Sequence, residues 1–508
     1  MRMIPIIGLE VHVQLKTQSK MFCSCPNVDD SADANSAVCT VCTGQPGALP
    51  ALNAHAITLG VRTGLALNCR IPDQSAFDRK NYFYPDLPKG YQISQFTLPV
   101  AVNGYLDITV PDSKPPRDKI RIGITRAHLE EDAAKNIHTT EGTAVDFNRA
   151  GTPLLEIVSE PDLRSPQEAK AYLQELRGVM RAIGASDAEM EKGQMRCDAN
   201  VSLLEIDDKN MPTQSFLNAR IEIKNLNSFR AVERAITYEI ERQTELYAAN
   251  TPPTGATRGW DENRGVTFEQ RSKESGADYR YFPEPDLPPQ DLVAIREHEA
   301  ARGIELPAEK RNRLSEEWWF TPADAAFFTT NDGWADYAEN VMGELGGWME
   351  STDDSGKSGG ELLNDHKKKL AKLAGGWLTS KLAGLMAEKN LTIKDLKITA
   401  EDFAEFLHLL DAGEINSANA QKLLAMMVET GTDPSVLMEE HDLGQNMDAG
   451  ALEETIARIV RENPDQVAQI KAGKVALIKW FVGATMKATE GKANPTVAEE
   501  IIKKEIGV

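Results

Sequence analysis

The chain has 508 residues, of which 41% are hydrophobic and 26% are charged, enough for about three domains with cores of their own. A formal net charge of -21 excludes a protein that binds nucleic acid through an overall basic surface, but it permits a local basic patch. The sequence has no run of about 18 apolar residues and begins with neither a secretory segment nor an Arg- and Ser-rich transit peptide. We therefore expect a cytoplasmic protein that makes no membrane contact.

The first predicted element is a strand over residues 7–16. Hydrophobic and polar side chains alternate there, which predicts that one face of the strand is buried. Glu10 and His12 lie two positions apart on the polar face. Ordinary solvated strand faces also carry such pairs, so this pair alone does not establish a site. Further strands are predicted over residues 119–127, 152–159, 196–205 and 218–225.

Four of the six cysteines follow this first strand closely. The pair Cys23 and Cys25 is separated by 13 residues from the pair Cys39 and Cys42. Two short cysteine pairs on one loop can place four thiolates tetrahedrally around Zn²⁺, and such a closed site is structural because it leaves no position for substrate. A redox pair or free thiols are the alternative interpretations. A disulfide framework is not expected in a cytoplasmic chain.

Residues 77–95 are rich in aromatic and cationic side chains, and their prolines and glycine predict a shaped loop. The cations in such a loop can contact phosphates, and its tyrosines can stack on a base. The alternative is a structural loop with solvated lysines. The residues singled out are Arg79, Lys80, Tyr82 and Lys89.

Carboxylates recur on two further predicted strands. Glu130 and Glu131 follow the strand predicted over residues 119–127, and strand parity alone does not choose between them. Glu156 lies inside an apolar strand, where a charge is costly unless it is paired or bound to a metal. Carboxylates with a minority of histidine suit Mg²⁺ or Mn²⁺ better than Zn²⁺. We predict a magnesium pocket formed by Glu10, His12, Glu131 and Glu156.

A helix is predicted over residues 166–183. Ser165 is a suitable N-cap, Glu168 would complete a capping box, and Gly184 is a suitable stop signal.

The polar residues after this helix are ambiguous. Asp198 alternates onto one strand face with Arg196 and is a secondary candidate for the metal pocket. Glu222 and Lys224 share a polar face in the same way, for which a solvated strand surface is an equally good explanation.

The fold class predicted from this pattern is α+β. A Pro-rich acidic segment ends an N-terminal domain, which we place at residues 1–290, and the pattern then becomes helical. A second boundary divides a helical domain, residues 291–397, from a helical tail, residues 398–508. Residues 351–360 are poor in hydrophobic side chains and predict an exposed or disordered loop.

The charge changes sign inside the tail. Residues 401–470 carry 15 acidic and 3 basic residues, a net charge of -12. Residues 471–504 carry 7 lysines and 3 glutamates, a net charge of +4. The tail therefore contains a local basic region, which includes Lys474, Lys487 and Lys492.

Longer motifs resemble the B subunit of the bacterial heterotrimeric aspartyl/glutamyl-tRNA amidotransferases. The resemblance extends over nearly the whole chain, and matching runs of this length are far more specific than one short motif. They are residues 8–15, 77–86, 91–95, 148–162, 224–229, 278–286 and 491–495. The resemblance implies a cradle-like N-terminal domain of mixed sheet and helices, followed by an all-helical middle domain and a small helical tail.

The resemblance also implies a reaction in two steps. ATP phosphorylates the side-chain carboxylate of glutamate on tRNA(Gln) or aspartate on tRNA(Asn), and ammonia then displaces phosphate to give the amide. The sequence contains no evident amidase constellation, so ammonia must come from elsewhere. In the family a separate amidase (A) subunit supplies it from glutamine, and a small C subunit joins the complex.

The roles of individual residues follow from the same resemblance. Glu10, His12, Glu131 and Glu156 match the Mg²⁺-binding positions of the family, and Lys80 and Lys89 match positions on the ammonia route. The cysteine pairs match its zinc site, and the lysine-bearing tail matches the part that grips tRNA. Two alternatives stay open: a non-catalytic tRNA-binding scaffold, and a zinc hydrolase, which the closed four-cysteine set disfavours.

Overall fold

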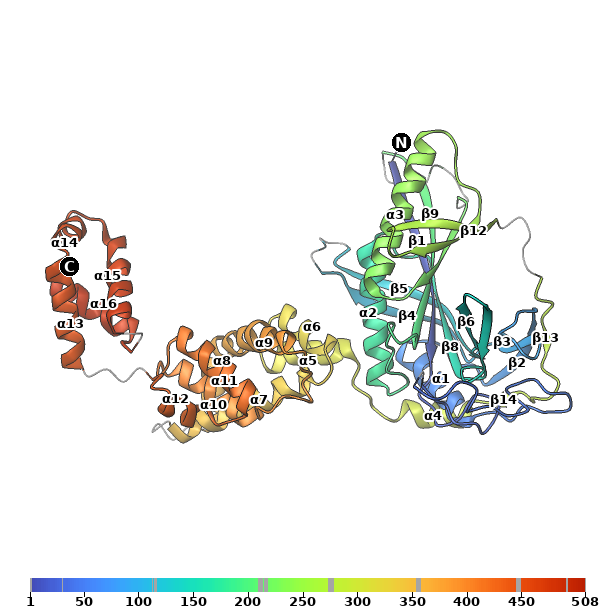
Figure 1. The fold of residues 1–508 in the computed structure, drawn as a ribbon, viewed down its shortest axis with the longest axis horizontal. Coiled ribbons are helices and arrows are strands. Elements are labelled where there is room, and N and C mark those ends of the chain that lie inside the picture. The colour runs from blue at the N-terminus through green and yellow to red at the C-terminus, as the bar shows by residue number, and fades with distance from the viewer. Residues whose placement is uncertain are drawn as a thin grey trace. The chain divides into compact units, whose positions relative to one another are not determined.

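The computed structural model describes residues 2–29, 31–111, 113, 117–208, 213, 218–272, 278–352, 358–444, 449–489 and 492–507. The chain divides into two compact units, Met1–Pro307 and Ala308–Val508. The first unit combines a mixed sheet with helices, and the second is helical (Figure 1). This arrangement confirms the predicted α+β class.

One large sheet organises the first unit. Within the described residues it has twelve strands, and β1 (Arg2–Gln14) lies between β8 (Pro153–Ser159) and β9 (Met195–Ile206). The main path runs in the order β12-β11-β10-β9-β1-β8-β5-β3-β2-β13, with β4 on β5 and β14 on β2. All described pairs are antiparallel except β10 with β11. The strands that we predicted are therefore confirmed.

The remaining bounds complete the sheet. The strands on one side of β8 are β2 (Gln74–Asn81), β3 (Tyr91–Leu98), β4 (Ala101–Thr109), β5 (Lys119–Glu131), β13 (Phe282–Pro283) and β14 (Gln290–Asp291). Those beyond β9 are β10 (Ile221–Leu226), β11 (Ala256–Asp261) and β12 (Val266–Ser272). A separate hairpin is formed by β6 (Lys135–Thr139) and β7 (Gly142–Asp146).

Helices cover the apolar face of this sheet (Figure 1). Leu9, Val11 and Val13 of β1 are almost fully buried in one core, to which the helices contribute residues such as Tyr172 and Val232. The polar residues between them on β1 therefore point to the other face, as the alternation predicts. The helices are α1 (Ala54–Ala66), α2 (Pro166–Ala182), α3 (Phe229–Ala248) and α4 (Val293–Ala300).

Helix α2 begins and ends where the sequence predicts. The Ser165 hydroxyl accepts a hydrogen bond from the Glu168 amide, and Gly184 adopts a φ of +69° after the last turn. The capping box itself is different, because the Glu168 carboxylate accepts from the Arg164 amide and from Arg117. Arg117 draws the carboxylate away from the N-cap amide that a capping box requires.

The helical unit contains two separate cores. One extends from Leu314 to Leu443 and therefore includes residues on both sides of position 397, and the other extends from Leu452 to Ile506. Residues 353–357 of the predicted loop lie outside the described residues, and the helices on either side are α7 (Trp334–Thr352) and α8 (Gly359–Gly376). None of the helices that the structure describes is both long and apolar enough to cross a membrane.

The elements of this unit are helical throughout. The first core is built from α5 (Pro307–Glu317), α6 (Pro322–Thr330), α7 (Trp334–Thr352), α8 (Gly359–Gly376), η1 (Trp377–Leu382), α9 (Ala383–Glu388), α10 (Ala400–Asp411), α11 (Ser417–Thr430) and α12 (Pro434–Glu440). The second is built from α13 (Ala449–Glu462), α14 (Pro464–Lys471), η2 (Val475–Leu477), α15 (Ile478–Ala488) and α16 (Pro495–Ile506).

Candidate active site

Strand register assembles a row of polar residues on the open face of the sheet. His12 of β1 is paired directly with Glu156 of β8, which in turn is paired with His128 of β5. On its other side β1 pairs Glu10 with Asp198 of β9. Residues far apart in sequence therefore become neighbours, because side chains opposite each other on adjacent strands lie close together.

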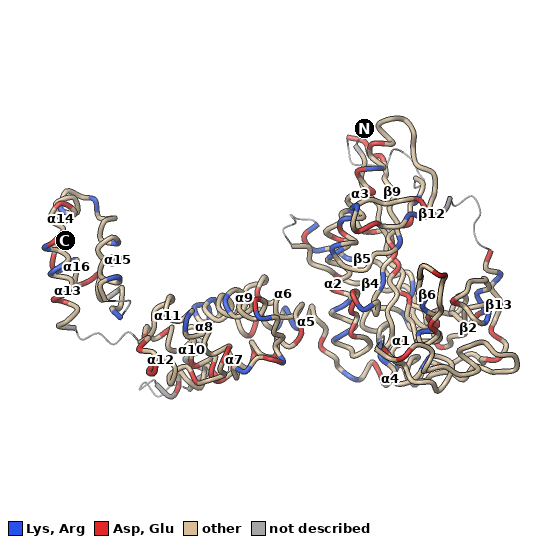
Figure 2. Tube along the Cα trace, viewed as in Figure 1, with Lys and Arg blue, Asp and Glu red and all other residues tan. Residues whose placement is uncertain are grey.

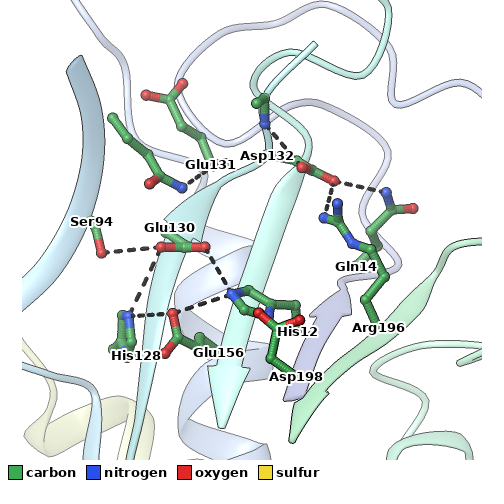
Figure 3. Close-up of polar contacts among 12 residues, drawn as sticks. His12, Gln14, Ser94, His128, Glu130, Glu131, Asp132, Glu156, Arg196 and Asp198 are labelled. Carbon is green, nitrogen blue, oxygen red and sulfur yellow. Dashed lines mark hydrogen bonds and ion pairs between the residues drawn. The ribbon is translucent and has the colours of Figure 1, made fainter. Parts of the chain in front are cut away.

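The centre of this row is a cluster of two imidazoles and two carboxylates (Figure 3). His12 Nε2 lies 3.3 Å from Glu156 Oε2 and 3.8 Å from Glu130 Oε1. His128 Nε2 lies 3.3 Å from the same Glu156 oxygen and 3.9 Å from Glu130 Oε2. The cluster is largely buried, so each of these charges depends strongly on the others.

The pKa values in this cluster reflect that dependence. Burial alone would lower the pKa of His12, but the hydrogen bond to Glu156 and the charges of Glu156 and Glu130 raise the pKa to about 9. Burial would raise the pKa of Glu156, but the two imidazoles hold this pKa well below its ordinary value. Glu156 is therefore ionised at neutral pH and available as a ligand.

A second group of carboxylates lies beside the first. Oxygens of Glu10, Asp198 and Glu222 approach within 4.8 Å of one another. Burial and the neighbouring carboxylates of Glu156, Asp198 and Glu222 raise the pKa of Glu10, because they disfavour its charged form. The Lys224 ammonium pairs with Asp198 and lies 2.8 Å from Glu222. A cation near Glu10 would favour the charged form of this carboxylate and so lower its pKa.

The structure does not bring Glu131 to this cluster. Both oxygens of Glu131 accept from the Lys89 ammonium, and one also accepts from the Ile93 amide at 3.0 Å. Adjacent residues of a strand point to opposite faces, so Glu130 faces His12 and Glu131 faces away. Of the four residues predicted for magnesium, Glu10, His12 and Glu156 share the polar face, and Glu130 stands in the place predicted for Glu131.

A pocket of about 330 Å³ adjoins the cluster, with His12 and Glu130 in its wall. Lys80 and Tyr82 line it, as do Arg196 and Lys224. The other two residues singled out from residues 77–95 are held in ion pairs, Arg79 of β2 with Glu284 and Lys89 with Glu131. The pocket therefore combines anionic metal-ligand types with cations that suit an anionic substrate.

His128 and Arg196 were not selected from the sequence as site residues, and Glu130 was left open as the alternative to Glu131. A signal for two of them was present, because His128 and Glu130 are two positions apart on one strand, as Glu10 and His12 are. In the sheet, β8 lies between the two strands that carry these pairs, and its Glu156 joins them on one polar face. For Arg196 the signal was its alternation with Asp198. Because β9 pairs with β1, Arg196 lies opposite His12 and Asp198 lies opposite Glu10.

The four clustered cysteines meet as predicted. Their sulfur atoms lie within 4.8 Å of one another, none is in a disulfide, and the sulfurs of Cys39 and Cys42 are 3.9 Å apart. A tetrahedron with Zn–S distances of about 2.3 Å has sulfur atoms about 3.8 Å apart. The geometry and the soft sulfur donors therefore fit Zn²⁺, held by Cys23, Cys25, Cys39 and Cys42.

The tail lysines lie on short helices or beside them, among both acidic and basic residues (Figure 2). Lys474 and Lys487 are exposed, and the Lys474 ammonium donates to Gln469 at 3.1 Å. Lys492 forms an ion pair with Asp442. Two of the three predicted tail residues are thus accessible to an anionic partner.

Comparison with known proteins is consistent with this geometry. The family described as the GatB/GatE catalytic domain matches residues 5–296, and the family described as the GatB domain matches residues 361–506. Relatives named as the B subunit of aspartyl/glutamyl-tRNA(Asn/Gln) amidotransferase occur in Persephonella marina and Thermomicrobium roseum. The first is 42% identical, with 98% of each chain covered. The second is 43% identical, with 98% of this chain and 97% of the relative covered.

A third relative with the same name, from Thermotoga maritima, is 41% identical, and 99% of each chain is covered. These similarities extend over both units, so they include the polar sheet face, the cysteine loop and the tail. The chain therefore belongs to the family of B subunits of aspartyl/glutamyl-tRNA(Asn/Gln) amidotransferases.

Proposed function

We propose that this chain uses ATP to phosphorylate the side-chain carboxylate of Glu-tRNA(Gln), Asp-tRNA(Asn) or both, and then amidates that carboxylate with ammonia. The observation that carries the proposal is the convergence of His12, Glu130 and Glu156 beside a pocket that also contains cations. A free carboxylate is a poor acyl donor, and phosphorylation converts one of its oxygens into a leaving group.

The polar cluster fits a Mg²⁺ ion by the chemistry of its donors. His12, Glu130 and Glu156 would hold the ion, with Glu10 and Asp198 beside them, and the bound ion would displace the proton that a pKa of about 9 leaves on His12 at neutral pH. Burial and the neighbouring carboxylates both raise the pKa of Glu10. When bound, Mg²⁺ offsets the negative charge on transferring phosphate oxygens. The donor set favours this ion over zinc, because oxygen donors predominate.

The chain's own cations complete this proposal. Lys80 lines the pocket and would orient the anionic oxygens of ATP and the acyl group, whereas Lys224 lines it as the partner of Asp198 and Glu222. Lys89, which pairs with Glu131 at the end of β5, would lie on the route by which ammonia reaches the pocket. Such positioning of reactants, together with charge stabilisation, accounts for most of the catalysis of phosphoryl transfer.

Partners are part of the same proposal. An amidase (A) subunit would supply ammonia from glutamine, and a small C subunit would complete a heterotrimer. The exposed lysines of the tail, Lys474 and Lys487, would contact the phosphates of the aminoacyl-tRNA. The cysteine loop would bind Zn²⁺ for structure, since four thiolates leave no position for a substrate.

The test uses this chain purified together with its two proposed partner subunits. We expect the complex to convert Glu-tRNA(Gln) or Asp-tRNA(Asn) to the amide with ATP, Mg²⁺ and ammonium chloride, without glutamine. Glu156→Gln should lower this rate at least about 100-fold, because it removes a charged ligand from the cluster. Glu269→Gln, an exposed carboxylate on β12, is the matched control and should leave the rate unchanged.

The main alternative is a tRNA-binding scaffold without chemistry of its own. Near wild-type amidation by Glu156→Gln would reject our assignment of the site. A wild-type complex that binds both tRNAs but amidates neither would favour the scaffold.

A further inference from the structure

The guanidinium of Arg196 is only partly used by the protein. It belongs to β9 and lines the pocket beside His12. Its Nη2 donates to Asp132 Oδ2 at 2.7 Å. Within the described residues this is the one hydrogen-bonded partner of the group, although a guanidinium has five N–H donors. Most of its donor capacity is therefore left for a ligand.

The partner of Arg196 is a fixed, buried carboxylate. Asp132 is only 5% exposed, and its Oδ2 also accepts from Gln14 Nε2 at 3.1 Å. Its Oδ1 accepts from the Ala133 amide at 2.9 Å, and Arg149 Nε lies 3.8 Å from Oδ2. A carboxylate held in this way fixes the orientation of the Arg196 guanidinium through its Nη2 atom. Figure 3 shows Asp132, Gln14 and Arg196 grouped beside His12.

Lys80 is the second cation with unused donors in this pocket. Its ammonium lies 5.0 Å from the ring centroid of Tyr279 and 5.8 Å from that of Tyr82. Among the residues that the structure describes, it has neither a hydrogen-bond acceptor nor a carboxylate within ion-pair distance. Lys224 differs, because Asp198 and Glu222 already neutralise it. Arg196 and Lys80 are thus the two cations of the pocket whose charge is available to a ligand.

We propose that Arg196, oriented by Asp132, binds an oxyanion of a substrate, with Lys80 as the second cation. This inference rests on the proposed function and identifies the residue that holds the anion. The ligand is either the side-chain carboxylate of the aminoacyl group or the phosphoryl oxygens of ATP. A planar guanidinium can donate two parallel hydrogen bonds to either group, which an ammonium cannot do. Asp132 is a positioning residue, since it acts through Arg196.

The experiment uses the complete complex and two measurements for each variant. The first is the KM for ATP and for Glu-tRNA(Gln) or Asp-tRNA(Asn) in ammonia-dependent amidation, and the second is equilibrium binding of each ligand. Arg196→Gln should weaken the binding of one of the two ligands by roughly 10- to 100-fold, which is the range for a hydrogen bond to a charged group. Arg196→Lys keeps the charge but cannot donate two parallel hydrogen bonds, so its affinity for that ligand should lie between those of Arg196→Gln and the wild type.

Removal of Arg196 alone leaves the buried Asp132 charge with less compensation, so folding must be separated from binding. The double variant Asp132→Asn/Arg196→Gln removes both charges and should show the same loss of affinity with a wild-type melting temperature. Asp132→Asn alone keeps the cation but frees its orientation, and should raise the same KM by a smaller factor. Arg121→Gln, in which an exposed Arg–Asp107 pair is lost, is the control and should change neither KM.

Each outcome decides between the alternatives. A weaker affinity for ATP alone assigns the phosphoryl oxygens, and a weaker affinity for aminoacyl-tRNA alone assigns the carboxylate. Wild-type affinity for both ligands in folded Arg196→Gln and in the double variant would overturn the inference. Failure of the proposed function is distinguishable, because it appears as absent amidation in the wild-type complex while the binding measurements still report on Arg196.

Discussion

The two ligand clusters of the N-terminal unit are built in opposite ways. The cysteine cluster comes from one loop, and its four ligands lie within 20 consecutive residues, Cys23 to Cys42. The polar cluster takes His12, Glu130 and Glu156 from three different strands. The first set is soft, sulfur-based and closed, whereas the second is oxygen-rich and opens into a pocket. We infer that the local cluster supports the fold and the assembled cluster performs chemistry.

Removal of metal should separate the two clusters most clearly. Without Mg²⁺ we expect amidation by the complex to be lost completely and to return when Mg²⁺ is added, because phosphoryl transfer depends on it. The melting temperature should change little. A zinc-selective chelator should instead lower the melting temperature, because metal binding by thiolates is coupled to folding. The comparison fails if zinc chelation stops amidation while the melting temperature stays constant.

The choice between Glu130 and Glu131 gives the next largest effect. Glu130→Gln should lower amidation at least about 100-fold and raise the Mg²⁺ concentration needed for half-maximal rate, because it removes a charge from the cluster. Glu131→Gln should leave that Mg²⁺ requirement unchanged, since its carboxylate pairs with Lys89 on the other side of β5. If the Mg²⁺ requirement shifts in Glu131→Gln and not in Glu130→Gln, Glu131 is the magnesium ligand, as predicted from the sequence.

That contrast also explains how far the sequence could be interpreted. Short-range patterns predicted the strand that carries Glu10 and His12, the start of α2 at Ser165 and the convergence of the four cysteines, because each depends on neighbours in sequence. The place of Glu130 depends on how β5 is paired with β8, which a sequence does not state. One residue of register reverses the face of every side chain, so Glu131 was an equally good choice beforehand.

Arg196 and Asp132 illustrate the same limit. Both were visible as polar residues, yet their contact joins β9 to the end of β5 across 64 positions of sequence. Two charged residues that are far apart in sequence have no local pattern that links them. Only the alignment of β9 with β1, which places Arg196 opposite His12, brings the guanidinium to the pocket.

The cysteine cluster should be tested by its effect on stability. Cys39→Ser should lower the melting temperature of the complex-bound chain by roughly 3 °C, which corresponds to about 2 kcal/mol for a unit of this size. Amidation measured well below that temperature should fall by less than in Glu130→Gln. Cys69→Ser, which changes a buried cysteine outside the cluster, is the control for loss of a thiol and should leave bound zinc unchanged. Equal zinc content in Cys39→Ser and the wild type would contradict the four-cysteine site.

The smallest expected effect concerns Gly151, which links the cysteine loop to the backbone of Asp132. Its carbonyl accepts from the Met21 amide at 2.7 Å, and its own amide donates to the Asp132 carbonyl at 2.9 Å. Gly151 has a φ of +86°, and an added Cβ would meet Cys42 and Lys20 at 3.5 Å, an ordinary contact distance. Gly151→Ala should therefore cost only the left-handed backbone conformation, about 1 to 2 kcal/mol.

The matched control for that variant is Gly193→Ala. Gly193 has a φ of +69° with nothing within 4 Å of an added Cβ, so its backbone cost should be similar. If Gly151 connects the cysteine loop to Asp132, Gly151→Ala should release zinc faster to a chelator and raise the same KM as Asp132→Asn, whereas Gly193→Ala should do neither. Identical behaviour of the two variants would mean that the two clusters are independent, because the shared backbone cost would then explain both results.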